Sequence, residues 1–139
     1  MPEEFADPDT IRTLLTSTRT WAVIGCSPDP WRDSHRIAKL LQGKGMRIIP
    51  VNPSAGMILG ERAYQSLAEI PAEIRIDVVD IFRRADQAGA HVDEAIATGA
   101  GAVWMQLGVI DVPAAQRARE AGLNVVMDRC PAIEFPRLS

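Results

Sequence analysis

The chain has 139 residues, of which 47% are hydrophobic and 24% are charged, and its formal net charge is −3. This length and balance are typical of an ordinary globular protein, so we expect one domain over residues 1–139. The negative net charge disfavours nucleic-acid binding, which depends on a basic surface. No apolar run approaches the ~20 residues that cross a bilayer, so no membrane association is expected.

The first residues of the chain and its few cysteines and histidines argue against secretion, a structural disulfide and a metal site. The first four residues are Met1-Pro2-Glu3-Glu4, which are acidic where a secretory signal is basic, and this predicts a cytoplasmic protein. Cys26 and Cys130 lie far apart in sequence, so a structural disulfide is not expected. The only histidines are His35 and His91, and a dedicated zinc site would require more donors. We therefore predict no metal site.

Helical patterns and short apolar runs alternate along the chain. Helices are predicted to begin at Asp7, Ser34, Asp86 and Asp111, whose side chains can cap the first turn. A short helix is expected near residues 66–69. Five runs are nearly continuous in apolar residues, as in parallel strands that are covered on both faces. The predicted strands are residues 21–25, 47–51, 76–81, 102–107 and 123–127.

This alternation predicts an α/β fold, with a Rossmann-like parallel sheet of about five strands and helices on both faces. Asp77 and Asp80 interrupt the third predicted strand, which favours an edge position for it. We therefore predict the strand order 3-2-1-4-5. In such sheets ligands bind beyond the carboxyl ends of the strands, where the strand order reverses. The candidate loops are residues 26–33, 52–57, 82–85 and 108–111.

The loop after the first predicted strand is a candidate for phosphate binding. Gly25 ends the strand without a side chain, so a ligand can approach the backbone closely. The next helix offers unpaired N–H groups and the positive end of its dipole. Ser27 and Ser34 add hydroxyl groups, and Arg32 and Arg36 add positive charge. The alternative is an ordinary loop whose polar groups only cap the helix.

The same loop differs from the dinucleotide-binding pattern G-x-G-x-x-G, because it lacks the second and third glycines. The second predicted strand ends in Val51-Asn52-Pro53, which offers no carboxylate for the ribose of NAD. Binding of NAD is therefore disfavoured. Binding of NADP stays open, because arginines could bind its 2′-phosphate.

Several segments resemble the small CoA-binding proteins, in the same order along the chain. They are Gly25-Cys26-Ser27-Pro28 with Trp31-Arg32, then Pro50-Val51-Asn52-Pro53, and then residues 77–83, 103–108 and 126–131. These proteins are similar to the CoA-binding domain of the succinyl-CoA synthetase alpha subunit. The resemblance runs from about residue 21 to residue 138.

The resemblance implies that the ligand is coenzyme A, with its phosphates in the loop after the first strand. Arg32, Arg83 or Arg84 could bind the 3′-phosphate, since guanidinium pairs with phosphate through two hydrogen bonds. Together with the polar residues of the loop, this gives a predicted site of Gly25, Cys26, Ser27, Arg32, Ser34, Val51, Asn52, Pro53, Phe82, Arg83, Gln106 and Gly108.

The sequence thus predicts a protein that binds CoA or acyl-CoA, with no catalytic set identified. The synthetase transfers phosphate through a histidine in a second domain, which this sequence does not match, so ligase activity is not carried over. The expected partners are CoA or acyl-CoA and an acyl-CoA enzyme, and the chain is a monomer or a homodimer.

Two other hypotheses stay open. One is an NADP-binding oxidoreductase or redox sensor of the same fold. The other is thiol chemistry at Cys26, because a helix entrance can lower the pKa of a thiol. Cys130, after the last predicted strand, is expected near the same rim.

Overall fold

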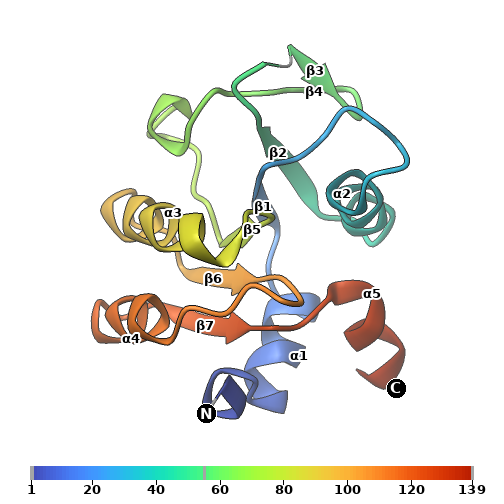
Figure 1. Cartoon of the computed structure of the whole chain (residues 1–139). Helices are drawn as coiled ribbons and strands as arrows, with labels where there is room; N and C mark the ends of the chain where they lie inside the picture. Colours follow the sequence, from blue (N-terminus) through green and yellow to red (C-terminus); the bar gives the residue numbers. More distant parts are fainter. Residues whose placement is uncertain (1, 55, 139) are drawn as a thin grey trace.

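The computed structural model describes residues 2–54 and 56–138. Its centre is a parallel sheet of the strands β1 (Thr20–Ile24), β2 (Arg47–Val51), β5 (Val78–Ile81), β6 (Ala102–Met105) and β7 (Asn124–Met127). These strands lie in the order β2-β1-β5-β6-β7 (Figure 1). The predicted α/β Rossmann-like fold is confirmed. A small hairpin of β3 (Met57–Ile58) and β4 (Glu61–Arg62) lies beyond β2.

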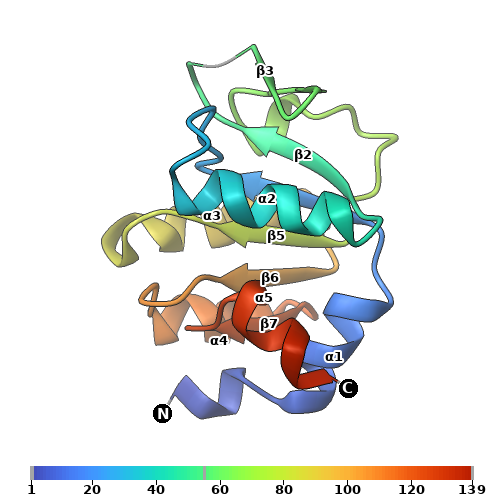
Figure 2. The same ribbon diagram turned by 90° about the vertical axis from the view of Figure 1, so that its right-hand side faces the viewer.

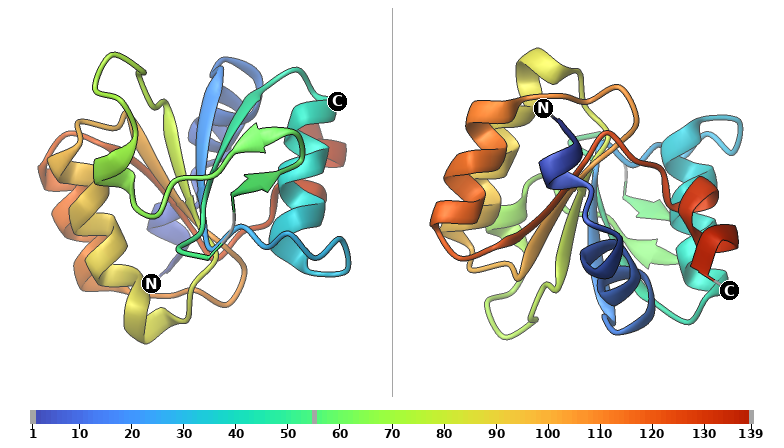
Figure 3. Two further views of the ribbon diagram at one scale, coloured as in Figure 1. Left: turned by 90° about the horizontal axis from the view of Figure 1, so that it is seen from above. Right: turned by 90° about the horizontal axis from the view of Figure 1, so that it is seen from below.

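Helices cover both faces of the sheet (Figures 2 and 3). One face carries α1 (Pro8–Thr16), α2 (Asp33–Gly43) and the short α5 (Pro131–Glu134), and the other carries α3 (Ala85–Ala97) and α4 (Val112–Glu120). The short 3₁₀ helices are Pro2–Phe5, Leu67–Glu69 and Phe135–Leu138. Within the part of the chain that the structure describes, no helix has both the length and the apolar character needed to span a bilayer.

Alternation along the strands divides the core between the two faces. In β1, Ala22 and Ile24 face α3 and α4, whereas Trp21 and Val23 face α1 and α2. Trp21 packs against Trp104 of β6, with their ring centroids 5.6 Å apart. Both indoles are fully buried, and each N–H has a hydrogen-bond partner.

Two of the three predicted aspartate caps begin helices, whereas Asp86 lies inside the first turn of α3, whose N-cap is Arg84. Asp7 accepts a hydrogen bond from Thr10 N at 2.9 Å at the start of α1, and Asp111 accepts one from Ala114 N at 3.1 Å at the start of α4. The prediction that Ser34 caps α2 is wrong. Ser34 lies inside the first turn, where its Oγ accepts a hydrogen bond from the backbone of Ser27.

The predicted strand order 3-2-1-4-5 is also wrong. The third predicted strand is β5, which lies between β1 and β6 rather than at an edge. Asp80 on this strand is fully buried, and burial raises the pKa of its carboxyl group well above its usual value. Asp77 comes just before β5, where its carboxylate accepts the N–H groups of Arg19 and Thr20. Neither carboxylate therefore requires its strand to lie at the edge of the sheet. In the observed order, the direction of the strand sequence reverses between β1 and β5.

Asp80 should make the stability of the protein depend on pH. An unfolded aspartate ionises near pH 4, whereas Asp80 stays protonated to higher pH in the folded state. Between these two pKa values the folded state binds more protons, so the free energy of unfolding falls as pH rises. Asp80→Asn removes this effect. Relative to wild type, the free energy of unfolding of Asp80→Asn should therefore increase with pH above pH 4, by up to about 1.4 kcal/mol per pH unit.

Urea unfolding of both proteins at several pH values, followed by tryptophan fluorescence, measures this difference. A difference between Asp80→Asn and wild type that stays constant with pH would contradict a neutral Asp80.

At Gly25 the loop after β1 lies directly on the loop after β5. Gly25 has a φ of +78°, and a Cβ at this position would lie 2.4 Å from the carbonyl oxygen of Phe82 and 3.3 Å from Cδ of Arg83. The N–H of Gly25 donates to the carbonyl oxygen of Val51 at 3.0 Å. Only a residue without a side chain can therefore join the ends of β1, β2 and β5 in this way.

Gly25→Ala should lower the free energy of unfolding by about 1–3 kcal/mol, because it combines a positive φ with contact against backbone. Gly43→Ala is the matched control. Gly43 ends α2, and a Cβ added there would meet nothing within 4 Å, so alanine should be neutral or stabilise by up to about 1 kcal/mol. Urea unfolding measures both variants. Equal free energies of unfolding for Gly25→Ala and Gly43→Ala would contradict the close approach of Gly25 to the backbone of Phe82.

Candidate functional site

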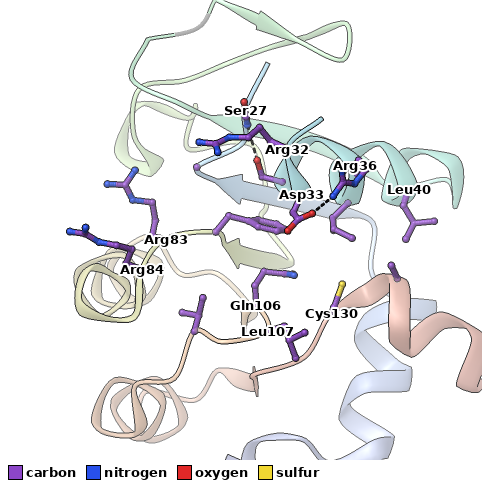
Figure 4. Close-up of a pocket in the computed structure, with 16 residues that line it drawn as sticks. Ser27, Arg32, Asp33, Arg36, Leu40, Arg83, Arg84, Gln106, Leu107 and Cys130 are labelled. Carbon is purple, nitrogen blue, oxygen red and sulfur yellow. Dashed lines mark hydrogen bonds and ion pairs between the residues drawn. The ribbon is translucent and has the colours of Figure 1, made fainter. Parts of the chain in front are cut away.

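A cavity of about 830 Å³ opens at the carboxyl edge of the sheet, between α2 and the loops that follow β1, β5, β6 and β7 (Figure 4). Its volume is within the range of small-molecule sites. It lies where the strand order reverses between β1 and β5, which is the expected position for a ligand in such a sheet.

Residues from distant parts of the sequence meet in this cavity. The predicted site residues that line it are Gly25, Ser27, Arg32, Ser34, Phe82, Arg83 and Gln106. The other lining residues are Asp33, Arg36, Ile37, Leu40, Arg84, Leu107, Val109, Cys130 and Ala132.

The other five predicted site residues do not line the cavity. The side chains of Cys26 and Val51 are buried in the hydrophobic core. Asn52 connects two loops, because its Nδ2 donates to the carbonyl oxygen of Cys26 at 2.9 Å. Pro53, next to Asn52, is exposed. In the loop after β6, the N–H of Gly108 donates to the carboxylate of Asp128 at 2.7 Å. Asn52 and Gly108 thus hold neighbouring loops together.

Side-chain hydrogen bonds fix the loop between β1 and α2. The N–H of Ser27 donates to Ser34 Oγ at 3.0 Å, and the N–H of Asp29 donates to Ser27 Oγ at 3.0 Å. The Nδ1 of His35 donates to the carbonyl oxygen of Ser27 at 3.0 Å. Both serine oxygens accept backbone N–H groups, so their hydroxyl protons can still be donated to a ligand.

The two helices that border the cavity begin differently from α1 and α4. The N-cap of α2 is Arg32 and the N-cap of α3 is Arg84, and neither helix has a side-chain hydrogen bond at its cap. An arginine near the positive end of a helix dipole is unfavourable in the absence of an anion. The first-turn N–H groups of α2 and α3 are therefore suited to an anionic ligand.

Four arginines line the same space (Figure 4). Arg36 forms an ion pair with Asp33, and Arg84 Nε lies 3.4 Å from Asp86 Oδ1. Within residues 2–54 and 56–138, Arg32 and Arg83 form no ion pair. Their charges are thus available to a ligand.

Much of the cavity lining is apolar, and it includes one buried amide. Ile37, Leu40, Leu107 and Val109 contribute aliphatic side chains. Gln106 is only 6% exposed and points into the cavity from the end of β6, and its Oε1 has no hydrogen-bond partner (Figure 4). The site therefore joins a cationic rim to an apolar wall that contains an amide available for hydrogen bonding.

The two cysteines lie in different surroundings. Cys26 is fully buried, and its pKa is raised to about 12, mainly by burial and further by the neighbouring carboxyl group of Asp80. A thiol in this state is a poor nucleophile, so the structure does not support the hypothesis of thiol chemistry at Cys26. Cys130 is partly exposed and lines the cavity.

Sequence reasoning missed α5, which brings Ala132 to the cavity, whereas Cys130 just before it lines the cavity as expected. The available signal is Pro131 directly after Cys130, because proline is favoured at the first position of a helix. Among the described residues, no group of three or more histidine, cysteine, aspartate or glutamate side chains could hold a metal ion.

The family model described as a CoA binding domain matches residues 19–136. The uncharacterized protein YneT of Bacillus subtilis (strain 168) is 39% identical over 120 residues, which are 86% of this chain and 87% of YneT. A hypothetical protein from Pyrococcus horikoshii OT3 is 36% identical in sequence, with a TM-score of 0.90 over 99% of this chain and 96% of that chain.

A third relative is the alpha subunit of ADP-forming acetate–CoA ligase II from Pyrococcus furiosus. It is 33% identical over 64 residues, which are 45% of this chain and 14% of the ligase subunit. The family match spans most of the sequence, and a structural relative covers nearly all of it. The chain therefore belongs to the family of CoA-binding domains, as its resemblance to the small CoA-binding proteins implied.

Proposed function

We propose that this chain is a non-catalytic protein that binds coenzyme A or acyl-CoA in the cavity at the carboxyl edge of its sheet. One observation carries the proposal. Two helices begin at the cavity with an arginine at the N-cap and no side-chain hydrogen bond there. A pyrophosphate and a 3′-phosphate would accept hydrogen bonds from the first-turn N–H groups that these caps leave without a side-chain partner.

The cavity also suits the rest of CoA. The pantetheine arm is a chain of alkyl and amide groups, which would match an apolar wall with the buried amide of Gln106. We propose direct contacts for the predicted site residues that line the cavity. For Cys26, Val51, Asn52, Pro53 and Gly108 we propose that they shape the adjoining loops, because their side chains do not line it.

The proposed role is binding rather than catalysis. Asp33 is the only carboxylate among the residues that line the cavity, and it is ion-paired with Arg36. The residues that line the cavity thus include no pair of carboxylates that could act as general acid and general base. The similarity to a CoA ligase subunit supports an acyl-CoA enzyme as the protein partner.

The unpaired arginines also fit the 2′-phosphate of NADP, so the test must compare ligands. We expect calorimetric titration to show CoA binding that weakens for 3′-dephospho-CoA and is absent for NADP. Arg83→Gln and Arg32→Gln should each raise the Kd for CoA about tenfold or more, because each removes a charge-assisted hydrogen bond.

Arg47→Gln is the control, because Arg47 is exposed at the start of β2, on the opposite edge of the sheet. Its Kd for CoA should equal that of wild type. NADP binding in place of CoA binding would overturn the proposal and favour the oxidoreductase hypothesis.

Gln106→Met should separate stability from binding. In the unliganded protein the buried Oε1 of Gln106 has no partner, so methionine should raise the free energy of unfolding by about 1 kcal/mol. The same change should weaken CoA binding by about tenfold, because the amide contact is lost. Gln116→Met on the exposed side of α4 should change neither quantity. Unchanged CoA affinity in Gln106→Met would contradict an amide contact with the ligand.

A further inference from the structure

The sulfur of Cys130 points into the same cavity as the amide of Gln106 (Figure 4). Gln106 follows β6 and Cys130 follows β7, and these two strands are parallel neighbours. The two side chains therefore come from adjacent strand ends, on the side of the sheet that carries α2.

The backbone before Cys130 is held in place by hydrogen bonds to β6 and the loop after it. Trp104 Nε1 donates to the carbonyl oxygen of Arg129 at 2.9 Å. The N–H of Asp128 donates to the carbonyl oxygen of Met105 at 2.8 Å, and the carboxylate of Asp128 accepts the N–H of Gly108 at 2.7 Å. Asp128 itself has a φ of +62°. The position of the thiol is thus set by the sheet.

Gln106 independently indicates a ligand beside Cys130. The residue is only 6% exposed, its Oε1 lacks a hydrogen-bond partner, and a buried amide of this kind is costly unless something binds it. The arm of CoA has amide groups along its length and a thiol at its end. An arm that pairs with Gln106 and lies along the apolar wall would bring its thiol end to Cys130.

We propose that Cys130 exchanges with CoA disulfide and holds CoA as a mixed disulfide within the cavity. This inference rests on the proposed CoA binding and adds a redox-sensitive, covalent state to it. The chemical class of the co-reactant is the symmetric disulfide of the same ligand.

The exchange balances without a separate oxidant. The Cys130 thiol loses its proton to solvent, and the thiolate attacks one sulfur of CoA disulfide. The S–S bond of CoA disulfide breaks as a new bond forms between Sγ of Cys130 and the pantetheine sulfur. The other half leaves as CoA thiolate and takes up a proton. Cys130 is oxidised, one CoA sulfur is reduced to thiol, and excess free thiol reverses the step.

Cys26 serves as an internal control for this exchange. It lies in the same chain, but its side chain is fully buried and lies outside the cavity lining. An exchange that depends on access to the cavity should therefore modify Cys130 and leave Cys26 reduced.

The experiment incubates the reduced, full-length chain with CoA disulfide and follows adduct formation by intact-protein and peptide mass spectrometry. We expect one CoA adduct, on the peptide that contains Cys130. Its rate should saturate with CoA disulfide and should exceed the rate with an equal concentration of oxidised glutathione by about 100-fold, because binding raises the effective concentration. Cys130→Ser should form no adduct.

Three outcomes would overturn the inference: no adduct, an adduct on Cys26, or equal rates with the two disulfides. Calorimetry with reduced CoA separates this failure from failure of the proposed function. If wild type binds CoA but forms no adduct, only the mixed disulfide is wrong. If wild type does not bind CoA, both proposals fail. Peptide mapping of wild type decides the question even if Cys130→Ser does not fold.

Discussion

The carbonyl oxygen of Phe82 occupies the space that a side chain at position 25 would need. Because Gly25 has none, the loop after β1 lies on the loop after β5 and also pairs with the end of β2. This contact joins the two halves of the sheet at the point where the strand order reverses. It also places Arg83 beside the start of the loop that leads to Arg32 and α2, so that residues far apart in the sequence share one cavity.

The charge around the cavity follows from how the helices begin. The helices α2, α3 and α4 each follow a strand and begin at the carboxyl edge of the sheet. Asp111 supplies the cap of α4 from within the chain, whereas α2 and α3 begin with Arg32 and Arg84 and have no such cap. Among these three helices, the two without a side-chain cap are therefore the two beside the reversal point, and each carries one aspartate, Asp33 or Asp86, in its first turn. These two helices follow β1 and β5, so the strand order and the uncapped helix starts both favour an anion at the cavity between them.

The sequence predicted the local structure better than the arrangement of the strands. The apolar runs and the caps Asp7 and Asp111 depend on neighbouring residues, and the structure confirms them. The strand order failed because Asp77 and Asp80 were taken as signs of an edge. Asp77 is bound by backbone N–H groups, and burial raises the pKa of Asp80. Such environments are created only by the folded chain.

The site was predicted in part for the same reason. Gly25, Ser27 and Ser34 belong to one continuous loop whose pattern is visible in the sequence, and all three line the cavity. Cys130, which follows the last strand, was expected near the same rim, and it lines the cavity. Cys26 follows Gly25 directly, yet its side chain turns into the core, which the sequence does not reveal.

The three indole groups are placed so that each reports on a different part of the molecule. The N–H of Trp21 is bonded to the hydroxyl of Thr18, next to α1, and that of Trp104 to the backbone carbonyl just before Cys130. Trp31 is 83% exposed in the loop between β1 and α2. In a proton–nitrogen NMR spectrum of protein enriched in nitrogen-15, three side-chain signals would therefore distinguish events in the loop, near α5 and beside α1.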